Sequence, residues 1–170
     1  MNAREAGLTG VVVALFADQA SKLLMLYTFG FATMPPGARL PVLPFLSLVM
    51  AWNRGVSFSM FSASTAAGVA ALSLFEILVI CALAYWMWTA TRRLLSLGLG
   101  LVVGGALGNL IDRLIHGRVA DFFDLHAFGH DFFACNLGDV AITLGVTVMV
   151  IDTLMEAMSP GEQEGQNLSR

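Results

Sequence analysis

The chain has 170 residues, of which 57% are hydrophobic and only 12% are charged, and its mean hydropathy is +0.77. A soluble domain carries roughly 25% charged residues, so a water-soluble fold is excluded and an integral membrane protein is indicated. The net charge of −3 and the lack of a basic cluster interleaved with aromatic residues argue against nucleic acid as a partner.

Four apolar stretches are each close to the roughly 20 residues that cross a bilayer core. They predict an all-α membrane protein with helices at about 8–29, 66–89, 94–111 and 140–158, the third being the shortest. The first is read as a retained helix and not a signal peptide, because its apolar run resumes after Lys22. We expect residues 1–158 to form one membrane-embedded domain and the polar residues 159–170 to be a disordered cytoplasmic tail.

The loops predict the orientation of the helices. The tight basic connection Thr91-Arg92-Arg93 faces the cytoplasm by the positive-inside rule, so both termini are cytoplasmic and residues 29–65 and 112–139 lie outside. Prolines exclude a helix in the early part of the first outer segment. A short hairpin on the membrane surface is expected within residues 45–61, with its turn near Asn53-Arg54-Gly55.

Polar residues gather at the outer ends of these helices. Asp18 and Lys22, four positions apart on one helical face, form either a structural ion pair or a support for a site. Asn109, Asp112 and Arg113 are expected to end the third helix at the same level. Such sorting to one side of the membrane indicates a functional site there.

Glycines recur at every fourth residue of the third helix, at Gly100, Gly104 and Gly108. This spacing predicts that another helix approaches closely along that face.

Two carboxylates stand between apolar residues in the second outer segment. Asp121 lies in Val119-Ala120-Asp121-Phe122-Phe123, and Asp139 opens the fourth helix. Each has a structural alternative, Asp121 as a loop residue and Asp139 as a helix-capping acid. Together they fit a shared-proton pair, with one carboxylate ionised as general base and the other protonated as general acid.

Other enzymatic chemistries have weaker support. The three histidines lack zinc-ligand spacing, so a zinc site is not expected. Cys135 as a thiol nucleophile, and Ser57 or Ser59 acting with Lys22, are the remaining enzymatic alternatives.

Two non-enzymatic alternatives also remain. One is a proton relay through Asp18, Glu76 and Asp139, and the other is a structural membrane subunit. Glu76 could pair with a polar group on another helix, face a cavity or be protonated.

The chain resembles the lipoprotein signal peptidases, also called signal peptidase II or prolipoprotein signal peptidases, a family of aspartic membrane peptidases. The blocks that carry the resemblance, in the family's order, are D-Q-A-S-K at Asp18–Lys22, N-R-G-V-S-F at Asn53–Phe58, G-N-L-I-D-R at Gly108–Arg113, V-A-D-F at Val119–Phe122 and N-L-G-D at Asn136–Asp139.

The resemblance implies four transmembrane helices with a small extracytoplasmic β-sheet, and Asp121 and Asp139 as the catalytic aspartates. The residues that it implies shape the substrate pocket are Asn53, Gly55, Asn109, Arg113 and Asn136. The residues that it implies support this pocket are Asp18, Lys22 and Asp112.

The implied substrate is a bacterial prolipoprotein whose cysteine carries diacylglycerol, and the implied reaction cuts just before that cysteine without metal or cofactor. We expect a monomer in contact with membrane lipid, in the bacterial inner membrane, with the site towards the extracytoplasmic face. The family's last block usually reads F-N-x-A-D, whereas Cys135 and Gly138 replace the Phe and the Ala here. This difference is expected to change the shape of the pocket more than its chemistry.

Overall fold

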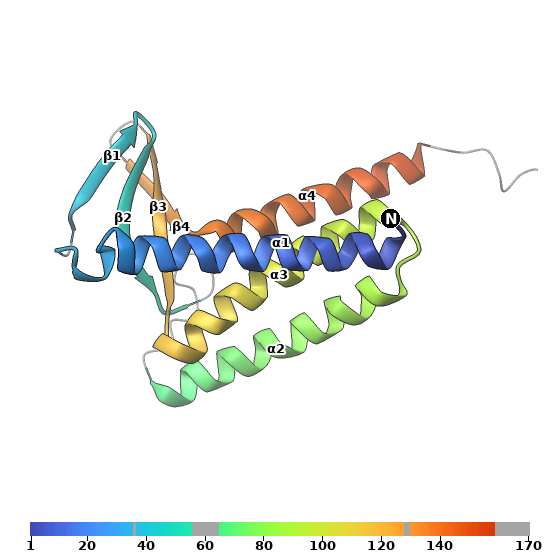
Figure 1. Cartoon of the computed structure of the whole chain (residues 1–170), viewed down its shortest axis with the longest axis horizontal. Coiled ribbons are helices and arrows are strands. Elements are labelled where there is room, and N and C mark those ends of the chain that lie inside the picture. Colours follow the sequence, from blue (N-terminus) through green and yellow to red (C-terminus); the bar gives the residue numbers. More distant parts are fainter. Residues whose placement is uncertain (36, 56–64, 128–129, 159–170) are drawn as a thin grey trace, which may run out of the picture.

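The computed structural model describes residues 1–35, 37–55, 65–127 and 130–158. Long helices lie side by side, and a small sheet closes one end of them (Figure 1). The helices are α1 (Ala3–Leu23), which continues into the π-helical turn η1 (Leu24–Thr28), α2 (Ala66–Thr89), α3 (Arg93–His116) and α4 (Leu137–Ala157). Within the described residues, these 4 helices are long and apolar enough to cross a membrane, which confirms the predicted fold class.

The helix boundaries differ from the prediction because side-chain caps extend two of the helices. Asn2 caps α1: its side chain accepts the Glu5 N–H at 2.9 Å, and the Glu5 carboxylate accepts the Asn2 N–H at 2.8 Å. Asn136 and Asp139 form the same reciprocal capping box at the start of α4. Hydropathy alone misses such caps, since the capping residues are polar.

The prediction that the third helix is the shortest is wrong. α3 has 24 residues and ends at His116, where Gly117 adopts the left-handed backbone with φ 68°. Asn109, Asp112 and Arg113 therefore lie inside the helix and do not end it. Their side chains are buried and paired, so their polarity does not require the helix to stop.

α3 is the central helix of the bundle. In its apolar window 61% of the residues are buried, against 11–22% in the other three helices. A Cβ added at Gly100 would collide with the backbone of Gly7, and one at Gly104 with the backbone of Val11. The predicted close approach along the glycine face is thus confirmed, and α1 is the helix that makes it.

The sheet has four antiparallel strands in the order β1-β2-β3-β4. They are β1 (Arg39–Leu43), β2 (Leu46–Asn53), β3 (Val119–Ala127) and β4 (His130–Cys135). β3 follows α3 and β4 leads into α4, so the sheet links the C-terminal end of α3 to the N-terminal end of α4 (Figure 1). On one face of the sheet, Ala120 and Phe122 pack against Phe31 and the end of the first helix. Successive side chains of a strand point to opposite faces, so Asp121 points the other way.

The outer hairpin forms one strand earlier than expected. β1 and β2 are its two strands, with Pro44 and Phe45 at the turn, and β2 pairs on its other edge with β3. Asn53 is the last residue of β2 and pairs with Val119 of β3. The chain therefore leaves the sheet at Asn53-Arg54-Gly55, where the sequence predicted a hairpin turn. Residues 56–61, which the expected hairpin would have used, and the tail 159–170 lie outside the described residues.

Adding a side chain at the contact between α1 and α3 should destabilise the bundle. For Gly100→Val we expect a loss of about 1–3 kcal/mol, because the new side chain must push Gly7 away. Thermal unfolding in detergent measures this as a midpoint several degrees lower. Ala71→Val, at an exposed position of α2, is the control and should melt like wild type. An unchanged midpoint for Gly100→Val would contradict the close packing.

Candidate active site

Asp121 is 2% exposed and lies on β3, between apolar neighbours that point to the other face of the sheet. Its Oδ1 accepts the side-chain amide of Asn136 at 2.6 Å, and the side chain of Asn53 also hydrogen-bonds to it. Burial, and then the negative charge of Asp139, raise the pKa of Asp121 to about 7, although the two amide hydrogen bonds act in the opposite direction. Asp121 can therefore hold or release a proton near neutral pH.

Asp139 is half-buried in the first turn of α4. Its Oδ1 accepts the side-chain amide of Asn109 at 2.9 Å, and its Oδ2 accepts the backbone N–H of Asn136 at 3.2 Å. The structural alternative for Asp139, a helix-capping acid, is thus confirmed. Hydrogen-bond donors at a helix N-terminus stabilise a negative charge on such a carboxylate.

Asn136 connects the two carboxylates. The Asp139 N–H donates to Asn136 Oδ1 at 3.0 Å, which leaves the NH₂ group of Asn136 to face Asp121. The cap of α4 therefore also orients the amide that binds Asp121.

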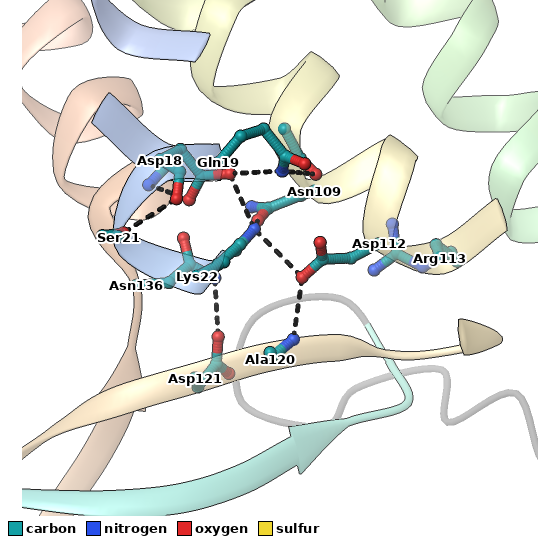
Figure 2. A network of polar contacts seen from close by, with 12 residues as sticks. Asp18, Gln19, Ser21, Lys22, Asn109, Asp112, Arg113, Ala120, Asp121 and Asn136 are labelled. Atoms are coloured by element: carbon teal, nitrogen blue, oxygen red, sulfur yellow. Dashed lines mark hydrogen bonds and ion pairs between the residues drawn. The ribbon is translucent and has the colours of Figure 1, made fainter. Parts of the chain in front are cut away.

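A buried ion network supports these groups from α1 (Figure 2). Lys22 Nζ lies 2.8 Å from Asp18 Oδ2, 3.1 Å from Asp112 Oδ2 and 3.1 Å from Asn109 Oδ1. Because Lys22 holds the carbonyl oxygen of Asn109, the NH₂ group of Asn109 is the one that faces Asp139. The side chain of Lys22 is only 3% exposed, so its three partners take the place of water.

The same network ties the helices to the sheet. Asp112 Oδ2 accepts the N–H of Ala120, the neighbour of Asp121, at 3.0 Å. Asp18 Oδ1 accepts the N–H of Gly138, the neighbour of Asp139, at 2.8 Å. The network of Asp18, Lys22 and Asp112 thus reaches the residue next to each carboxylate, Gly138 through Asp18 and Ala120 through Asp112.

Arg113 lies on the α2 side of the site. One of its guanidinium nitrogens pairs with Glu76, and the other donates to the carbonyl of Gly55 at 3.0 Å. Glu76 therefore pairs with a polar group of another helix, one of the three alternatives that the sequence left open.

A cavity of about 250 Å³ lies between α2, α3 and α4. Asn109, Asp139, Arg113 and Glu76 are its polar lining, and apolar side chains of α2 form the opposite wall. A second, shallower cleft of about 320 Å³ runs over the sheet past Asp121. Asn53 lines both, so the two carboxylates sit where the two spaces approach each other.

The alternative nucleophiles find little support in this arrangement. Burial, and then the charges of Asp139 and Asp121, raise the pKa of the Cys135 thiol to about 11, which keeps it protonated at neutral pH. Ser57 and Ser59 lie outside the described residues, and Lys22, their expected base, is held by two carboxylates. Among the residues that the structure describes, no cluster of His, Cys, Asp and Glu could hold a metal ion.

All ten predicted site residues lie in the described part of the chain, and direct contacts join them in one network. Figure 2 shows the part of this network around Lys22 and Asp121. The sequence did not predict strands β3 and β4, the backbone donors at Ala120 and Gly138, or the partner of Glu76. The strands had a signal, since two aromatic-rich runs flank Gly129. The other contacts join residues 8 to 120 positions apart, and no local pattern marks them.

The family model described as signal peptidase (SPase) II matches residues 10–155. The chain belongs to this family. A lipoprotein signal peptidase of Rhodopseudomonas palustris (strain ATCC BAA-98 / CGA009) is 43% identical to it, over 88% of this chain and 92% of that relative. A lipoprotein signal peptidase of Beijerinckia indica is 38% identical, over 98% of this chain and 100% of the relative.

Solved structures agree with this membership. A bacterial membrane enzyme determined by the in meso method at 2.3 Å resolution matches with a TM-score of 0.78 and 27% identity, over 94% of this chain and 93% of the other. A second one, at 1.9 Å resolution, matches with a TM-score of 0.72 and 28% identity, over 88% and 93%. The chain is therefore a signal peptidase II, a protease that removes signal peptides from prolipoproteins.

Removing the central cation should unfold this peptidase more easily. Lys22→Met leaves Asp18 and Asp112 buried without their counter-charge, which costs about 3–5 kcal/mol for a buried pair. We expect a clearly lower thermal midpoint in detergent. Arg4→Met is the control, since Arg4 is exposed and contacts the ring and the backbone carbonyl of Trp88, and this variant should melt like wild type. Equal midpoints for Lys22→Met and wild type would show that the network does not stabilise the fold.

Proposed function

We propose that Asp121 and Asp139 are the catalytic pair of this signal peptidase. The observation that carries the proposal is that one side chain, Asn136, hydrogen-bonds to both residues, so that Asp121 of β3 and Asp139 of α4 lie close together where the cleft over the sheet and the cavity between the helices approach each other. Two carboxylates so placed titrate as a coupled pair, and one proton is shared between them.

The surroundings favour different roles for the two carboxylates. Asp139 receives N–H groups at a helix N-terminus and is the ionised general base. Asp121, whose pKa is raised to about 7, is the protonated general acid. Asp139 takes a proton from a water molecule, the water attacks the scissile carbonyl, and Asp121 protonates the developing oxyanion or the leaving amine. The C–N bond of the tetrahedral intermediate then breaks and releases the amine, and a proton that passes from Asp139 to Asp121 restores the starting state.

The proposed substrate is a prolipoprotein whose cysteine carries diacylglycerol, cut just before that cysteine. The apolar wall of α2 beside Asp139 suits acyl chains or an apolar peptide segment. Asn53, Gly55, Asn109, Arg113 and Asn136 hold the substrate or the loops around it.

We further propose that the enzyme is a monomer in the bacterial inner membrane, in contact with its lipids, with both termini in the cytoplasm. Arg92 and Arg93 lie at the end of the bundle that is opposite to the sheet, together with the N-terminus (Figure 1). The positive-inside rule assigns that end to the cytoplasm, so the sheet and the two carboxylates face outwards.

The proton-relay alternative requires acids spread through the depth of the membrane. Asp18 pairs with Lys22 and Glu76 pairs with Arg113, and both lie near the sheet end. Asp112 and Asp139 also lie at the sheet end, and the other acids of the described helices, Glu5, Asp152 and Glu156, lie at the far end. The stretches between, such as 94–107 of α3 and 140–151 of α4, contain no charged residue. This distribution disfavours a relay.

Replacing either proposed catalytic residue should abolish cleavage. Asp121→Asn and Asp139→Asn keep the side-chain volume but cannot exchange the proton, so we expect each to lower kcat by at least about 100-fold. The assay is cleavage of a diacylglyceryl-modified prolipoprotein by purified enzyme in detergent, with folding checked by a thermal melt.

The matched control is Asp124→Asn, which removes another buried carboxylate of β3 that pairs with Arg39 outside the proposed site. It should cleave at a rate close to wild type. A folded Asp121→Asn or Asp139→Asn variant with near-normal activity would overturn the assignment of the pair. A wild-type enzyme that cleaves unmodified and lipidated substrate equally well would overturn the proposed substrate.

The raised pKa of Asp121 predicts a pH limit for catalysis. A general acid must be protonated, so kcat/KM should decline as the pH rises through about 7. The pH–rate profile of wild type between pH 5 and 9 measures it. A rate that stays constant to pH 9 would show that Asp121 does not supply the proton.

The raised pKa of Asp121 also predicts how the stability of the protein depends on pH, which can be measured without any substrate. Protonated Asp121 is favoured in the folded state, so the folded protein loses relative stability as the pH rises from about 4 to about 7. Asp121→Asn removes this loss. At pH 8 the free energy of unfolding of this variant should exceed that of wild type by on the order of 1–4 kcal/mol, and its melting temperature should be higher. The difference should shrink as the pH falls towards 4, and a constant difference would contradict the raised pKa.

A further inference from the structure

Glu76 is the one charged residue of α2, which is otherwise apolar from Ala66 to Thr89. None of the five sequence blocks shared with the family contains it. Its side chain is 18% exposed and lines the cavity beside Asn109 and Asp139. A carboxylate in such a place is costly in a membrane helix, which makes a role in the site a reasonable expectation.

Glu76 is the counter-ion of Arg113. The Arg113 guanidinium is 8% exposed and has one nitrogen on Glu76 and another on the carbonyl of Gly55. The planar guanidinium group fixes the angle between these two hydrogen bonds. With one nitrogen held by α2, the other is aimed at the chain that leaves the sheet.

Gly55 is linked directly to Asp121. Its N–H donates to the Asn53 side-chain oxygen at 3.0 Å, which leaves the Asn53 NH₂ group to bind Asp121. A continuous path of contacts thus runs from Glu76 through Arg113, Gly55 and Asn53 to Asp121.

Glu76 also determines where the charge of Arg113 lies. Asp139 lines the same cavity as Arg113 and is the other carboxylate among the lining residues. An unpaired guanidinium would be drawn towards Asp139 and would leave Gly55.

We propose that Glu76 is a positioning residue of the peptidase: it holds Arg113 on the α2 wall, so that Arg113 keeps the Asn53–Gly55 corner against Asp121 and stays away from Asp139. This role rests on the proposed catalytic pair. In this role α2 helps to position Asp121, the proposed general acid, and also forms a wall of the cavity.

The first test is Glu76→Gln, which keeps the size of the side chain and one acceptor oxygen but removes the charge. A misplaced corner affects the transition state more than substrate binding, so kcat should fall by about 10-fold to 100-fold with KM changed less than about threefold. Glu76→Asp keeps the charge and should recover part of the loss. The assay is the lipidated prolipoprotein cleavage in detergent, with rates normalised to folded enzyme.

A double-mutant cycle shows whether Glu76 acts through Arg113. If it does, Glu76→Gln should cause no further loss in an Arg113→Gln background, because the group that it positions is already absent. If the fold-losses in kcat of the two single variants multiply in the double variant, Glu76 acts independently of Arg113, and the proposal is overturned.

Glu156→Gln is the matched control, since Glu156 also pairs with an arginine, Arg92, but at the far end of the bundle. It should leave kcat and KM unchanged. A Glu76→Gln enzyme with wild-type kcat, or with only a raised KM, overturns the positioning role while the catalytic pair stands. If a folded Asp121→Asn or Asp139→Asn variant keeps near-normal activity, the proposed catalytic pair is wrong, and the role of Glu76 that rests on it is wrong as well.

Discussion

The structure depends on one buried ammonium group. Lys22 is held between Asp18 and Asp112 with almost no access to solvent, and it supplies the counter-charge for both buried carboxylates. Its two partners each use a further oxygen or lone pair to hold a backbone N–H, at Gly138 and at Ala120. The position of α4 and of β3, and therefore of both proposed catalytic carboxylates, follows from this single charge.

The proposed catalytic carboxylates themselves have amides and not cations as neighbours. Asn136 and Asn53 hydrogen-bond to Asp121, and Asn109 to Asp139. A cation in contact would favour the ionised form of Asp121 strongly and lower its pKa, whereas an amide satisfies the oxygen without neutralising the charge. Lys22 therefore acts one step away, through Asn109, and Arg113 is balanced by Glu76. This arrangement leaves a proton free to move between Asp121 and its surroundings.

The sequence predicted the elements that depend on composition and missed those that depend on distant contacts. Hydropathy located the four helices, because burial in lipid requires long apolar runs. It shortened α3, because Asp112 and Arg113 look like an end when their partners, on α1 and α2, are unknown. It placed the outer hairpin too late, since Asn53-Arg54-Gly55 resembles a turn but leaves a strand whose second partner, β3, follows 66 residues after Asn53.

The candidate site residues could be predicted more completely than the fold, because short sequence blocks contain these residues. The same blocks explain what was missed. Glu76 lies outside them, and only the structure places its carboxylate on Arg113. Gly138, which departs from the family pattern, lies where a Cβ would crowd Gly105 of α3 and Asn136, so the substitution permits a close approach of α4 and not a looser backbone.

The spacing of Asp18 and Lys22 within one helix has a consequence for how the protein enters the membrane. Asp112 and Asp139 are synthesised long after α1, so the ammonium of Lys22 must cross into lipid before most of its final partners exist. A carboxylate four residues away on the same helical face gives α1 a neutral pair of its own. The first helix can thus be inserted alone and then act as the fixed point on which α3 and α4 dock. Asp139 arrives with the last helix, so a chain interrupted after α3 and before α4 holds Asp18, Lys22 and Asp112 but no complete pair of acids.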